Sequence, residues 1–155
     1  MTAPFDQLDF IYMPSRDVAA DAGYFTGVLG AELVFAIEAM GTRVAMIKLA
    51  EPPPRLLLAD HVDGDSPILV YRVRDLDAGL AELVGRRWEQ ERAIELPMGP
   101  ACSFTTPGGQ RIAIYEATRP GVVEGFTGRR DFLAEAKHAH QPRKLARPAG
   151  FEPAA

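Results

Sequence analysis

A repeat at an offset of 58 residues constrains this chain more than any other feature of its sequence. Residues 16–20 read Arg-Asp-Val-Ala-Ala, and residues 74–78 read Arg-Asp-Leu-Asp-Ala. An apolar run with an aromatic residue precedes each copy, and apolar residues at helical spacing follow it. Asp17 and Asp75 stand where each helix should begin, so that a side-chain oxygen can accept from the free backbone amides there. The repeat predicts two similar units.

Three strand-like segments follow each predicted helix. They cover residues 32–37, 43–49 and 55–59 in the first half, and residues 88–95, 101–105 and 111–116 in the second. Gly and Pro residues separate the segments, as expected of turns between strands. We interpret the pattern as two tandem βαβββ units, about 5–60 and 66–117, in one α+β domain over residues 1–117. The simpler alternative is an α+β domain in which the short match is a coincidence.

Composition excludes several classes of function. The formal net charge of −4 gives no general attraction to nucleic acid. No apolar run approaches the ~20 residues of a membrane span, and no basic segment followed by an apolar stretch opens the chain, so we expect a cytoplasmic protein. The single cysteine, Cys102, excludes an internal disulfide and predicts a buried, inert thiol.

The chain resembles the glyoxalase/bleomycin-resistance/dioxygenase family, also called the vicinal oxygen chelate superfamily, over about residues 5–117. The resemblance rests on Ser15-Arg16-Asp17, on Val28-Leu29-Gly30, on residues 71–78, and on the Pro-x-Gly turn that leads into a strand within residues 106–116. It implies two βαβββ units that form a cupped mixed β-sheet with helices outside. It also implies a site for a small organic molecule in the cup and assembly as a homodimer.

Metal-binding members of this family place a ligand in the first strand of each half and a carboxylate in the last strand of each half. The corresponding positions here hold Phe10, Ile68 and Ala113, while the register of the first half's last strand stays open. None of these side chains can ligate a metal ion. Asp9 adjoins Phe10, but regular alternation along a strand would turn it to the other face, and Glu116 would likewise face away from Ala113. We therefore predict no metal at this site and no cofactor.

Alternation along the strands predicts which side chains face the inside of the cup. The predicted ligand-binding residues are Phe10, Tyr12, Ile68, Val70, Arg72, Ala113 and Tyr115. Apolar and aromatic walls with a few polar groups are typical of small-molecule sites. Arg72 could bind a carboxylate or phosphate in bidentate fashion, pair with an internal carboxylate such as Glu38, or extend its charged end to the rim of the cup.

Residues 118–155 form a C-terminal extension beyond the two units. From Ala117 onward the net charge is +3, against −7 for the rest of the chain, which favours docking onto the body or onto a partner. We expect Phe126 and Phe132 to anchor the extension, residues 133–139 to form a short helix, and the end from Gln141 to be mobile.

Together these observations predict metal-independent binding or sequestration of a small organic molecule. The alternative is a metal-dependent lyase, isomerase or dioxygenase of the same family that uses atypical ligands such as Asp60, His61 or Glu116. A third hypothesis is a module kept for protein–protein contact through residues 118–140. No carboxylate–histidine pair suited to acid–base catalysis is evident, so catalysis and the identity of the ligand stay open.

Overall fold

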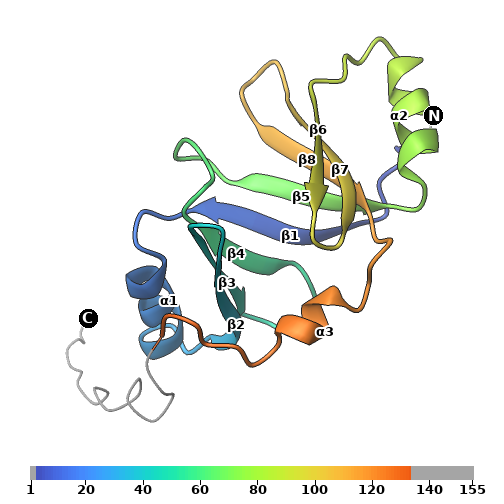
Figure 1. Ribbon diagram of the computed structural model, residues 1–155. Helices are drawn as coiled ribbons and strands as arrows, with labels where there is room; N and C mark the ends of the chain where they lie inside the picture. Colours follow the sequence, from blue (N-terminus) through green and yellow to red (C-terminus); the bar gives the residue numbers. More distant parts are fainter. Residues whose placement is uncertain (1–2, 134–155) are drawn as a thin grey trace.

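The computed structural model describes residues 3–133, which form one curled eight-stranded sheet and three helices (Figure 1). The strands are β1 (Gln7–Pro14), β2 (Glu32–Ala39), β3 (Thr42–Lys48), β4 (Arg55–Ala59), β5 (Ile68–Val73), β6 (Arg92–Leu96), β7 (Gly99–Thr105) and β8 (Arg111–Glu116). The helices are α1 (Val18–Gly27), α2 (Leu76–Val84) and α3 (Val122–Phe126). The strand order β2-β3-β4-β1-β5-β8-β7-β6 makes two four-stranded halves that meet at β1 and β5.

The two halves repeat one local structure. β1 pairs in parallel with β4 in the first half, and β5 pairs in parallel with β8 in the second. Asp17 Oδ1 accepts a hydrogen bond from the Ala20 amide at 3.0 Å, and Asp75 Oδ1 accepts one from the Ala78 amide at 3.0 Å. Each carboxylate thereby satisfies a free amide in the first turn of its helix. The predicted tandem βαβββ architecture is confirmed.

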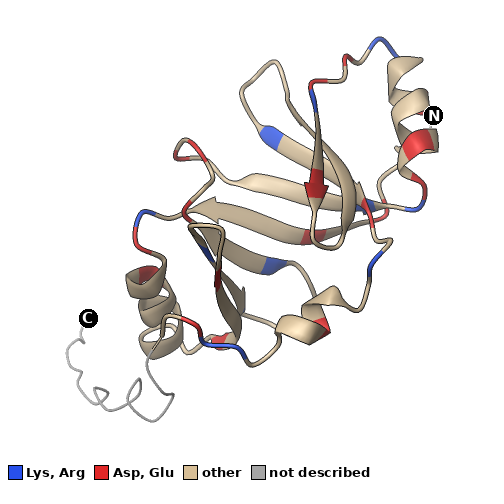
Figure 2. Ribbon diagram, viewed as in Figure 1, with Lys and Arg blue, Asp and Glu red and all other residues tan. Residues whose placement is uncertain are grey.

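The sheet has an outer side covered by α1 and α2 and an inner side that forms the cup. On the outer side, α1 packs Val18 and Ala22 against the first half, and α2 packs Leu76 against Ile114 of the second. On the inner side, one cluster joins both halves through Phe10, Phe35, Met46, Leu57, Val70, Met98, Ala101, Ala113 and Tyr115. Charged residues lie mostly on loops, helices and strand ends (Figure 2). The inner side is therefore largely apolar.

A β-bulge interrupts the alternation in β1. The pairing of β1 with β5 shifts between Leu8 and Phe10. As a result Asp9 and Phe10 both approach Tyr115 on the inner side, the first through a hydrogen bond and the second through a ring contact at 5.9 Å between centroids. The expectation that Asp9 faces away from Phe10 is wrong because it assumed an unbroken two-residue period.

The C-terminal extension docks on the edge of β2. The amide of Gly128 donates to the carbonyl of Val34 at 2.9 Å, and the amide of Ala36 donates to the carbonyl of Arg129 at 2.8 Å. These bonds satisfy backbone groups that a strand at a sheet edge would leave unpaired. Phe132 packs against the outer cluster next to α1, as predicted for an anchor. Residues 134–155, with most of the expected short helix and all of the expected tail, lie outside the described residues.

The extension also fills the inner side of the first half. Val122, Val123 and Phe126 of α3 pack against the inner cluster. The Phe126 ring meets the Phe35 ring edge-on at 5.4 Å between centroids, which confirms the second predicted anchor. α3 thus lies inside the cup, in contrast to α1 and α2.

Several strand ends differ by one or two residues from the sequence-based expectation, and one strand start differs by more. The strand expected to begin at Trp88 begins at Arg92, because Trp88 instead packs edge-on against Phe104 and belongs to the outer cluster. The first helix ends at Gly27, before Gly30, which adopts a positive φ of 76° in the following turn.

Candidate functional site

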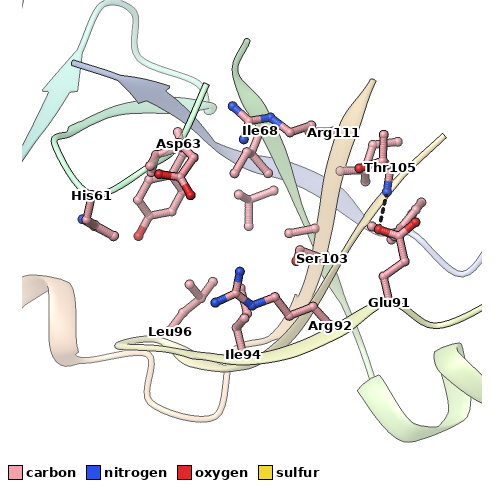
Figure 3. A pocket seen from close by; sticks show the side chains of 16 residues that line it. His61, Asp63, Ile68, Glu91, Arg92, Ile94, Leu96, Ser103, Thr105 and Arg111 are labelled. Atoms are coloured by element: carbon pink, nitrogen blue, oxygen red, sulfur yellow. Dashed lines mark hydrogen bonds between the residues drawn. The ribbon is translucent and has the colours of Figure 1, made fainter. Parts of the chain in front are cut away.

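The inner side of the second half contains a cavity of about 270 Å³. Strands β5 to β8 and the linker between the halves surround it (Figure 3). It is lined by Tyr12, His61, Val62, Asp63, Ile68, Val70, Glu91, Arg92, Ile94, Leu96, Ser103, Phe104, Thr105, Arg111, Ile112 and Ala113. The corresponding part of the first half is filled by α3.

Four of the seven residues predicted from the sequence line this cavity. They are Tyr12, Ile68, Val70 and Ala113. The other three, Phe10, Arg72 and Tyr115, are not among the lining residues. Phe10 and Tyr115 are buried in the inner cluster, whereas Arg72 contacts Asp9. The cavity therefore includes four of the seven predicted residues.

Asp9 is the centre of a polar cluster at the bulge. Its Oδ2 accepts a hydrogen bond from the Tyr115 hydroxyl at 2.5 Å and lies 3.7 Å from Arg72 Nε. Its Oδ1 accepts a hydrogen bond from the side-chain amide Nε2 of Gln7 at 2.6 Å. Burial, followed by the hydrogen bond to Asp9, raises the pKa of Tyr115 well above its usual value. Arg72 thus takes the second of its expected roles and pairs with an internal carboxylate, although the partner is Asp9. Glu38 pairs with Arg43 instead.

Tyr12 brings a phenol into the cavity. Burial raises its pKa to about 12, so its hydroxyl stays protonated near neutral pH. The ring of His61 meets the ring of Tyr12 edge-on at 6.4 Å between centroids. None of the hydrogen bonds identified within residues 3–133 uses the Tyr12 hydroxyl. It can donate to a ligand without giving up another partner.

The residues predicted from the sequence include none of the charged lining residues, which are Asp63, Glu91, Arg92 and Arg111. Arg92, Ile94 and Leu96 are spaced two residues apart on β6, and all three line the cavity. Figure 3 shows the Arg92 guanidinium directed into the cavity. Glu91 accepts from the Thr105 amide at 3.0 Å, at the opposite end from His61 and Asp63 (Figure 3).

Cys102 is not part of the cavity lining. It is fully buried beside Ile114 in the outer cluster, as predicted. Burial raises the pKa of its thiol, which disfavours the nucleophilic thiolate.

Comparison with solved structures identifies the fold. The structure of methylmalonyl-CoA epimerase from Mycobacterium tuberculosis matches with a TM-score of 0.64 and 19% sequence identity, over 77% of this chain and 93% of that one. A hypothetical protein from Bacillus halodurans matches with a TM-score of 0.60 and 11% identity, over 71% of this chain and 93% of that one. The chain has the vicinal oxygen chelate fold. No family model and no curated protein sequence matches this chain.

The structure assigns the fourth metal position of the vicinal oxygen chelate fold, which the sequence left open. Leu57 pairs with Tyr12 in the first half as Ala113 pairs with Val70 in the second. The four positions are therefore Phe10, Leu57, Ile68 and Ala113, three of them at most 8% exposed. Hydrocarbon side chains offer no donor atom, so these positions do not fit a metal ion.

Two of the three atypical ligands considered from the sequence form hydrogen bonds outside the cavity. Asp60 Oδ1 accepts from the Arg43 amide at 3.0 Å, and Glu116 Oε1 accepts from the Leu76 amide at the start of α2 at 2.9 Å. His61 lines the cavity. Within residues 3–133, no three His, Cys, Asp or Glu side chains gather in a way that could hold a metal ion.

Proposed function

We propose that this protein binds a small organic molecule in the cavity of the second half, without a metal ion, and acts by holding or sequestering it. The cavity carries the proposal, since eight of its sixteen lining residues are apolar and the other eight supply polar groups, and small-molecule sites combine both. Two matched structures of methylmalonyl-CoA epimerase hold methylmalonyl-CoA or 2-nitronate-propionyl-CoA. Those complexes support the view that proteins of this fold bind small ligands.

Substitution of Ile68 tests the cavity directly. We expect members of a panel of small aromatic and aliphatic molecules to raise the melting temperature of the wild-type protein, because a ligand that binds only the folded state stabilises it. Ile68→Trp places a larger side chain in the cavity and should weaken binding by about tenfold or more. Calorimetric titration of the molecules that raise the melting temperature measures the change.

Two further variants make the result interpretable. Leu49→Trp adds the same indole at a residue that is 51% exposed and outside the cavity, and it should bind like the wild type. Ser103→Leu narrows the cavity from another wall, in case Ile68→Trp does not fold. Equal affinity in wild type, Ile68→Trp and Ser103→Leu would place the ligand elsewhere.

Elemental analysis tests the metal-independent part of the proposal. Protein purified without a histidine tag should retain less than about a tenth of an equivalent of Mn, Fe, Co, Ni or Zn after incubation with each, because the four family positions supply no donors. Close to one equivalent of a single metal would contradict metal independence. It would favour a metal-dependent lyase, isomerase or dioxygenase.

Two expectations from the sequence belong to the same proposal. Assembly as a homodimer follows from the family resemblance, and the cytoplasmic location follows from composition; both remain predictions. Among the described residues, no helix is long and apolar enough to cross a membrane.

A further inference from the structure

Two arginines line the cavity, and only one of them is held by the protein. Arg111 donates from Nε to the Ser66 hydroxyl at 3.1 Å and from Nη2 to the Ser66 carbonyl, so it ties the linker to β8. Arg92 has no hydrogen bond or ion pair to its guanidinium within the described residues. A cation that points into a cavity without a partner favours an anionic ligand.

The surroundings of Arg92 suit a ligand that joins an anionic group to an apolar body. Ile94 and Leu96 share its face of β6, and Ile68 lies on the opposite wall (Figure 3). Arg92 is itself exposed, so it can receive an anion from solvent while these apolar side chains contact the rest of the ligand. The planar guanidinium can donate two parallel hydrogen bonds to a carboxylate.

The acidic lining residues limit how much negative charge a ligand can carry. Asp63 stands beside His61 on one side of the cavity, and Glu91 stands on the other side, bonded to the Thr105 amide (Figure 3). These two carboxylates offset the charges of the two lining arginines, so the cavity has no excess of positive charge for a second anionic group on the ligand. The arrangement suits a ligand with one negative charge.

We infer that the cavity selects a small monocarboxylate, with its carboxylate on Arg92, its apolar body against Ile68, Ile94 and Leu96, and a hydrogen bond from Tyr12. The inference rests on the proposed function and specifies the class of its ligand. A volume of about 270 Å³ lies just below the usual range for ligand sites, about 300–1,000 Å³, and suits a body of about one ring.

A matched pair of probes tests the inference. 4-Ethylbenzoate and 4-ethylbenzamide have nearly the same shape, but only the first is charged near neutral pH. We expect the benzoate to bind the wild-type protein roughly three- to tenfold more tightly, because the bond to a guanidinium is charge-assisted but solvent screens a pair at an exposed residue. Arg92→Gln should remove this preference and leave the affinity for the amide within about twofold.

The control variant is Arg74→Gln, which removes one positive charge from an exposed residue outside the cavity. It should keep the preference of the wild type. Equal binding of the two probes by the wild-type protein, or an unchanged preference in Arg92→Gln, would overturn the inference while the cavity remains a binding site. If neither probe nor any neutral molecule of the panel binds, both the inference and the proposed function fail.

Discussion

Asp9→Ala is expected to lower the free energy of unfolding by about 2–4 kcal/mol, since buried polar groups that lose their partner cost roughly 1–3 kcal/mol each. The Asp9 side chain is 10% exposed, and it accepts hydrogen bonds from Tyr115 and Gln7. Tyr115 is itself only 3% exposed, so water cannot readily replace the lost carboxylate. The ion pair between Asp9 and Arg72 contributes less to the free energy of unfolding, because the Arg72 side chain is 41% exposed and solvent screens the pair. Urea unfolding of the two proteins measures the difference.

A double-mutant cycle separates the hydrogen bond from the general effect of truncation. Tyr115→Phe should cost about 1–2 kcal/mol alone and clearly less in the background of Asp9→Ala, because both changes remove the same bond. Additive losses would show that the two side chains do not interact.

The cluster also predicts how stability changes with pH. Burial and Asp9 raise the pKa of Tyr115 in the folded state. The stabilisation that Tyr115 contributes is therefore complete below the pKa of about 10 that tyrosine has in the unfolded chain. It is lost as pH rises above that value, because the unfolded chain loses the phenol proton while the folded protein still keeps it. The loss of stability between about pH 9 and pH 11 should be smaller in Tyr115→Phe than in the wild-type protein. An identical loss in both proteins would contradict this assignment.

The architecture could be predicted from the sequence because the same pattern of signals occurs in both halves. Asp17 and Asp75 each cap a helix, and the glycines and prolines separate the strands. Each of these signals depends only on residues close together in the chain, so it can be recognised in a single sequence. The repeat also placed Phe10 and Ile68 at equivalent positions of the two first strands, and the parallel pairings with β4 and β8 confirm this equivalence.

The candidate site was harder to predict because two non-local features shape it. The bulge in β1 depends on pairing with β5, and it brings Asp9 to the inner side, where it engages Arg72 and Tyr115. The sequence had favoured Arg72 as a cavity residue. The docking of α3 across the first half does not follow from local sequence patterns either, and it places apolar side chains against the inner cluster there, whereas the second half holds the cavity.

Gly99→Ala should strongly destabilise the fold. Gly99 begins β7 at the tip of the β6–β7 hairpin, and a Cβ built on it would lie 1.9 Å from the carbonyl oxygen of Glu116. The atom it meets is backbone, so relief requires the hairpin to move away from the end of β8. We expect the free energy of unfolding to fall by about 3 kcal/mol or more.

Gly23→Ala is the matched control for this prediction, because a Cβ on Gly23, within α1, would meet nothing within 4 Å. Alanine favours helix over glycine, so this variant should be up to about 1 kcal/mol more stable than the wild type. Unfolding curves of the two variants should therefore shift in opposite directions. Gly99→Ala, unlike Gly23→Ala, should also weaken ligand binding, because Ile94 and Leu96 of the β6–β7 hairpin form a wall of the cavity. If Gly99→Ala unfolds like the wild-type protein, the close contact between Gly99 and the Glu116 carbonyl does not exist, and this contact does not hold the hairpin wall of the cavity in place.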